Sequence, residues 1–227
     1  MDGAYARRTR TAHPTFRSVA VPASALILVN LVLMYLVAST PLSALNNALF
    51  QIPIVGVLVY GAALTGGSIL AERGLERGSM GLASVGTVLL QAAYALFGGG
   101  ILATVAAGSR AAVLGVALVV TLGMTLAISG YVYLRDREFD HWSRWSLGAF
   151  IIGVLFVAVG SVFPIVLVGG FVFIFLGFTL RLGYEIWHVR SSYAPDRSLI
   201  HALGIYVAFT GVFVHVLQIV ARNFLRE

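Results

Sequence analysis

Long apolar runs separated by short polar segments dominate the chain from residue 19 to residue 222. Each run is about twenty residues long, which is the length that an α-helix needs to cross the hydrocarbon core of a bilayer. The pattern therefore predicts an all-α membrane protein, a bundle of seven transmembrane helices. The helices are expected at residues 19–39, 48–70, 79–106, 111–134, 146–163, 165–188 and 199–221.

Polar residues and prolines mark the breaks between these runs. Pro41, Asn46 and Asn47 predict a short turn after the first run, and residues 71–78 close the second. Pro164 predicts a tight turn after the fifth run, because proline cannot continue a preceding helix without losing a hydrogen bond.

The same pattern predicts one membrane domain, residues 19–222, between a basic cytoplasmic tail at 1–18 and a short tail at 223–227. The first apolar run follows basic residues, as a signal peptide does. Its length, from Ala20 to Ser39, exceeds the usual signal core of about 7–15 residues. We therefore expect a retained signal-anchor helix.

Composition agrees with a polytopic membrane protein. Hydrophobic residues make up 59% of the 227 residues and charged residues 11%, and the mean hydropathy is +0.93. A soluble domain has about 25% charged residues. The strands of a membrane β-barrel would instead give alternating segments of about ten residues. The chain has no cysteine, which excludes disulfides, thiolate metal sites and cysteine nucleophiles.

The net charge of +6 comes from arginines that lie between the apolar runs, so it indicates topology and not nucleic-acid binding. With the N-terminus inside, eleven arginines are cytoplasmic and three are outside. The cytoplasmic set is Arg7, Arg8, Arg10, Arg17, Arg73, Arg77, Arg135, Arg137, Arg144, Arg190 and Arg197, and the outer set is Arg110, Arg222 and Arg226. This bias predicts a cytoplasmic N-terminus and an outer C-terminus in the plasma membrane.

Arg181 and Glu185 are ionisable residues inside the sixth apolar run. Their spacing of four places them on one helix face. Charges in membrane spans are costly and usually face a protein interior or a water-filled cavity. Burial would favour a protonated Glu185, whereas Arg181 one turn away would favour the carboxylate. The pair predicts a proton sensor or cation ligand; the alternative is a local ion pair that reaches interfacial water.

The seventh run carries His201 and His215, with Ala208 midway, on a stripe of heptad spacing. Histidine titrates near neutral pH and could gate an ion path, with Tyr206 and Thr210 supplying polar contacts. His201 could instead be an interfacial residue at the helix start. His215 could be a neutral side chain that hydrogen-bonds between helices.

Two further segments each allow two interpretations. The connector 135–145 combines three acids with three arginines and two tryptophans, which favours a segment at the headgroup level over a cation site. Gly98, Gly99 and Gly100 favour close helix packing, and a hinge in the third span is the alternative.

No nucleotide loop, HExxH or GxSxG motif is present, so we expect no enzyme activity, no cofactor and no metal centre. An intramembrane hydrolase is also disfavoured, because no nucleophile and base can be paired from the sequence.

Several segments, in their order and spacing, resemble the Bax-inhibitor family of transmembrane proteins. They are Ala93-Tyr-Ala-Leu-Phe-Gly98, the stretch Thr121–Tyr131 followed by Arg137-Glu-Phe139, the stretch Phe178–Glu185, and the stretch Ala202–Phe213 followed by Leu217-Gln218. The resemblance covers about residues 19–222 and is specific from about residue 93 onward.

The resemblance implies a seven-helix protein linked to calcium leak and pH-dependent closure, with two carboxyl groups in spans six and seven sharing a proton. The first acid corresponds to Glu185, but the second corresponds to Ala208, which cannot titrate, and a family asparagine corresponds to Gly211. Span two also lacks a basic residue that some relatives use as a partner, for which Arg181 could substitute.

These observations leave two hypotheses of different kinds. The first is a bundle that leaks calcium or other cations, with Glu185, Arg181, His201, Tyr206, Ala208, Thr210 and His215 at the ion path or gate. The second is a non-conducting interaction protein that binds a membrane protease or channel, and the missing second acid favours it.

Overall fold

The computed structural model describes residues 16–224, which form α-helices and short 3-10 turns without a strand. The helices are α1 (Phe16–Ala38), α2 (Ser43–Leu49), α3 (Pro53–Glu76), α4 (Met80–Ala103), α5 (Arg110–Leu134), α6 (His141–Gly160), α7 (Leu167–Ser192) and α8 (Ser198–Phe224). The parts of the two predicted tails at residues 1–15 and 225–227 lie outside the described residues.

Within residues 16–224, seven helices are long and apolar enough to cross a membrane, which confirms the predicted number. The turn predicted around Asn46 is instead the short helix α2. The second span begins at Pro53, where a proline suits the first turn of a helix. It continues to Glu76, because the charged residues after position 70 are good helix formers. Gly78, with a φ of 66°, then ends it in the left-handed conformation.

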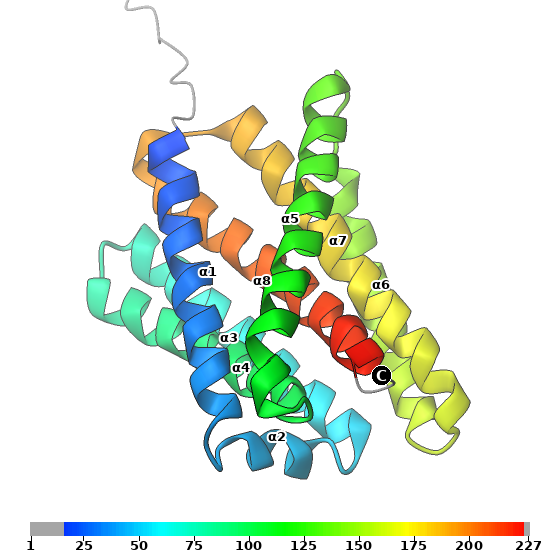
Figure 1. Cartoon of the computed structure of the whole chain (residues 1–227). Coiled ribbons are helices and arrows are strands. Elements are labelled where there is room, and N and C mark those ends of the chain that lie inside the picture. The colour runs from blue at the N-terminus through cyan, green and yellow to red at the C-terminus, as the bar shows by residue number, and fades with distance from the viewer. Residues whose placement is uncertain (1–15, 225–227) are drawn as a thin grey trace, which may run out of the picture.

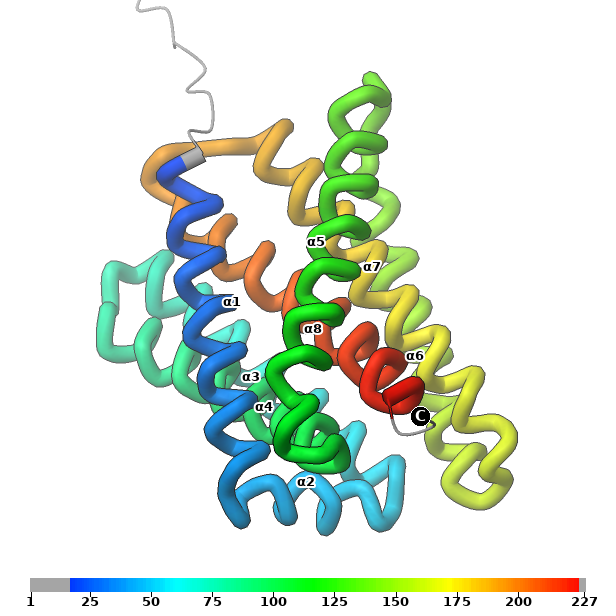
Figure 2. The backbone as a smooth tube through the Cα atoms, in the orientation of Figure 1, coloured from blue at the N-terminus to red at the C-terminus, as the bar shows by residue number. Residues whose placement is uncertain are grey.

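Helix α8 lies at the centre of the bundle. In Figures 1 and 2 it crosses behind α1 and α5, while α3 and α4 lie to one side and α6 and α7 to the other. Its buried residues surround its whole circumference, as expected for a helix enclosed by others. The start of α1 and the α7–α8 link lie at one end of the molecule, and α2 and the α6–α7 turn lie at the other (Figure 1).

The glycine run in α4 serves close packing. The helix is unbroken from Met80 to Ala103, so Gly98, Gly99 and Gly100 do not interrupt it. A Cβ atom at each of these glycines would overlap a residue of α1 or α2: Met34, Val37 and Asn46 respectively.

A buried polar network joins three helices. The Asn30 amide of α1 donates to both the backbone oxygen and Oε1 of Gln91 in α4, at 3.0 and 2.6 Å. It also lies 3.4 Å from the hydroxyl oxygen of Tyr206 in α8. The Gln91 amide donates back to the Leu26 carbonyl of α1 at 2.9 Å. Such bonds hold helices together where no water can replace them.

Candidate ion site between α3, α7 and α8

A cavity of about 150 Å³ lies where the end of α3, the second half of α7 and the start of α8 meet. It gathers most of the ionisable side chains of the described bundle interior. Its lining residues are Glu72, Arg181, Tyr184, Glu185, His188, Ile200, His201 and Gly204.

An ion pair between Arg181 and Glu185 occupies this cavity. Nη2 of Arg181 lies 2.6 Å from Oε1 of Glu185, as the four-residue spacing on α7 predicts. The Glu185 side chain is 6% exposed and the Arg181 side chain 39% exposed, so the pair joins the interior to the cavity mouth. The guanidinium also lies over the ring of Tyr184, with Cζ 5.3 Å from the ring centroid.

Gly204 allows α8 to approach this pair closely. A Cβ atom at position 204 would overlap the Glu185 carboxylate, so a larger residue there would displace the carboxylate from its present position. The carboxylate of α7 is thereby held directly against the backbone of α8.

Glu72 is a second carboxylate in the cavity, and the sequence analysis did not single it out. It lies in the last two turns of α3, which were predicted to be a closing segment after the second span. The good helix formers after position 70 indicate that the helix continues through Glu72, but nothing in the sequence shows that α3 ends beside α7.

His201 lies on the cavity wall, 4% exposed, at the start of α8. Its ring packs edge-on against that of His188, with centroids 5.0 Å apart. Nε2 of the imidazole has no hydrogen-bond partner. His201 is therefore a buried residue of the cavity wall with an unpaired ring nitrogen.

The other predicted path residues of α8 do not line the cavity. Tyr206 belongs to the polar network with Asn30, and Ala208 is fully buried in the apolar core one turn beyond Gly204. Thr210 is buried, and its hydroxyl oxygen has no hydrogen-bond partner.

His215 lies apart from the cavity in an aromatic enclosure. Its Nδ1 is 2.8 Å from the carbonyl oxygen of Gly211, one turn earlier on α8. The rings of Phe171, Phe175 and Phe178 surround it, with centroids 5.1 to 5.9 Å away. The structure therefore joins Glu185, Arg181 and His201, and leaves His215 separate.

Two of the connector acids lie beside arginines. Asp140 lies 3.9 Å from Arg144, and Asp136 lies 3.6 Å from Arg190, and both acids are exposed. Within residues 16–224, no three or more His, Asp or Glu side chains are arranged to hold a metal ion.

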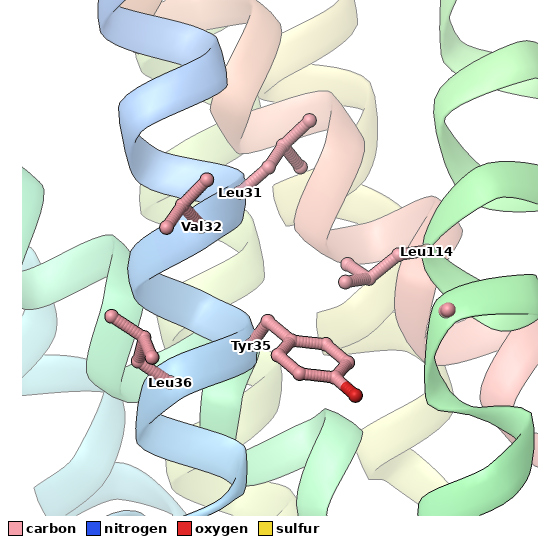
Figure 3. Close-up of a pocket in the computed structure, with 6 residues that line it drawn as sticks. Leu31, Val32, Tyr35, Leu36 and Leu114 are labelled. Carbon is pink, nitrogen blue, oxygen red and sulfur yellow. The ribbon is translucent and has the colours of Figure 1, made fainter.

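A second pocket lies between α1 and α5 and is lined almost wholly by apolar groups. Figure 3 shows Tyr35 of α1 projecting across it toward α5, with Leu31 and Leu114 on opposite walls. It presents no charged group, so the α3–α7–α8 cavity is the better candidate for ion chemistry.

A comparison with protein families gives one match that spans the membrane region. The family model described as "Inhibitor of apoptosis-promoting Bax1" matches residues 17–224, which covers all seven membrane-length helices. No curated protein and no solved structure matches the chain significantly.

Proposed function

The chain belongs to the Bax-inhibitor family, and we propose that it lets calcium or other cations leak across the plasma membrane without catalysing a reaction. In this proposal the Arg181–Glu185 pair closes the path at the cytoplasmic side. The polar cavity, in a bundle that is otherwise mostly apolar, is the observation that carries the proposal. Charged side chains in a membrane interior are costly and usually mark ion or proton pathways.

Closure by the ion pair makes the flux pH-sensitive. Protonating Glu185 removes its attraction for Arg181, so we expect more flux on the acidic side of neutrality than on the alkaline side. The groups that face Glu185 are Arg181, Tyr184 and His188 on α7, Glu72 on α3 and His201 on α8. Two of them are histidines, whose ordinary titration range lies near neutral pH.

A second candidate function is that of a non-conducting interaction protein, which binds a membrane protease or channel. Two observations favour it: Ala208 replaces the second acid of the family, and Thr210 and His215 do not connect with the cavity. Partners that copurify with the wild type, and still do so with Glu185→Gln, would support it.

Calcium influx into liposomes that hold the purified protein tests the first candidate. Glu185→Gln and Arg181→Ala should each raise the flux severalfold above that of wild type, because each breaks the closing pair. Asp140 and Arg144 form an exposed pair with the same spacing, so Asp140→Asn and Arg144→Ala are matched controls that should leave the flux unchanged. If wild type and both cavity variants stay at the level of empty liposomes, the conduction proposal is wrong.

A further inference from the structure

The charges around the cavity are not balanced. Glu72 and Glu185 contribute two carboxylates, whereas Arg181 is the one basic side chain that is not a histidine. Arg181 pairs with Glu185, and Glu72 forms no ion pair within residues 16–224. With both carboxylates ionised, the cavity has an excess of negative charge that would attract a cation.

His201 adds an open hydrogen-bond acceptor on the α8 side of the cavity. The side chain is more than nine-tenths buried, yet Nε2 has no partner. In the neutral tautomer that carries its proton on Nδ1, Nε2 has a lone pair that can accept a hydrogen bond. A buried acceptor without a partner is costly, and it is expected to be satisfied by a molecule in the cavity.

The cavity is large enough for several waters. Its volume of about 150 Å³ corresponds to about five water molecules, at about 30 Å³ each. A cation that enters it can therefore keep part of its hydration shell. This matters because no three His, Asp or Glu side chains of the described bundle converge tightly enough to bind a bare metal ion.

We propose that the cavity binds a hydrated divalent cation, with Glu72 supplying the charge and Nε2 of His201 accepting a hydrogen bond from a water of its shell. The positively charged guanidinium of Arg181 lies in the same cavity, and it competes with the bound cation for the carboxylates. The proposal rests on the proposed function, because it locates the place where a permeating cation would pause.

Equilibrium binding of radioactive ⁴⁵Ca²⁺ tests this site independently of transport. The full chain is held in phosphatidylcholine nanodiscs, and free Ca²⁺ is the only ligand. Glu72→Gln should weaken binding at least about tenfold, and Arg181→Gln should strengthen it by a similar factor, since each changes one charge in the cavity. Glu76→Gln is the matched control, one turn further along α3 and outside the cavity, and should bind as wild type does.

Two results would overturn the site. One is equal affinity in wild type and Glu72→Gln with unchanged thermal stability. The other is an absence of binding in both wild type and Arg181→Gln. Binding that depends on Glu72 without any liposome flux would leave the site standing and refute conduction. If Glu185→Gln changes the liposome flux but Glu72→Gln does not change the Ca²⁺ affinity, the binding site is refuted and the conduction proposal stands.

Discussion

At the scale of single residues, Gly204 determines how the Glu185 carboxylate lies. Because position 204 has no side chain, the backbone of α8 packs directly against the carboxylate, which is oriented toward Arg181 on its own helix. A buried charge is tolerated only when it is paired in this way. The contact also links the α7–α8 packing to the ion pair.

Gly204→Ala should break this arrangement. The new methyl group overlaps the carboxylate, so the Glu185 side chain must shift, which disturbs its pair with Arg181. We expect a lower thermal stability in detergent together with a raised calcium flux, as for Glu185→Gln. Gly123→Ala on α5 is the control, since a Cβ there meets nothing within 4 Å. Equal stability of the two variants would contradict the proposed contact.

The sequence predicts the charged pair of α7 well but not its surroundings. Two charged residues four apart share a helix face whatever the helix packs against. The ion pair between Arg181 and Glu185 can therefore be predicted from the sequence. Glu72 and His201 join them only because the end of α3 and the start of α8 meet at the same place. Contacts between helices depend on the packing of the whole bundle, which spacing along one helix does not encode.

At the scale of helices, α3 and α4 pack through glycines. Gly74 and Gly86 lie at the contact, and a Cβ at either would overlap the backbone of the other helix, at Ala83 and Ala71 respectively. Small residues let membrane helices approach closely, which increases van der Waals contact where the hydrophobic effect contributes little. Apolar composition predicts both helices, but α3 differs from the expected span 48–70 at both ends, because Pro53 begins the helix and the charged residues after position 70 continue it.

Gly86→Ala should destabilise the α3–α4 pair. Backbone atoms cannot rotate away as a side chain can, so the two helices must separate, at a cost of about 1–3 kcal/mol. Gly81→Ala, near the start of the same helix and without a neighbour within 4 Å, should be neutral. Thermal unfolding in detergent measures both, and an equally tolerated Gly86→Ala would show that the helices are not in close contact.

The polar network should couple α1 to α4. Gln91→Leu leaves the Asn30 amide without its main acceptor side chain, so we expect a loss of about 1–2 kcal/mol. In a double-mutant cycle with Asn30→Leu, the second substitution should cost less than it does alone, with a coupling of about 0.5–2 kcal/mol. Strict additivity of the two losses would mean that the bond does not contribute to stability.

At the scale of the whole molecule, the central position of α8 sets the arrangement of the other helices. The helix is buried on all sides, and its start forms one wall of the ion cavity. The end of α3, the end of α7 and the start of α8 thus belong to one end of the bundle. The arginine bias predicts that this end is cytoplasmic.

The orientation can be tested directly, because the chain has no cysteine of its own. Ser79→Cys in the α3–α4 turn and Gly108→Cys between α4 and α5 both place a thiol at an exposed position. In intact cells, a membrane-impermeant maleimide should label position 108 and not position 79. The reverse pattern would place the cavity at the outer side and contradict the predicted topology.

The most direct test of the central claim is calcium flux into proteoliposomes from about pH 6 to about pH 8, with wild type, Glu185→Gln and Ala208→Asp side by side. We expect the calcium flux of wild type to be higher at the acidic end of this range. We expect the flux of Glu185→Gln to be high and to depend less on pH. A silent wild type beside a conducting Ala208→Asp would contradict it. That outcome would mean that this chain does not conduct because it has alanine, and not an acid, at position 208. It would favour the second candidate function, a non-conducting interaction protein.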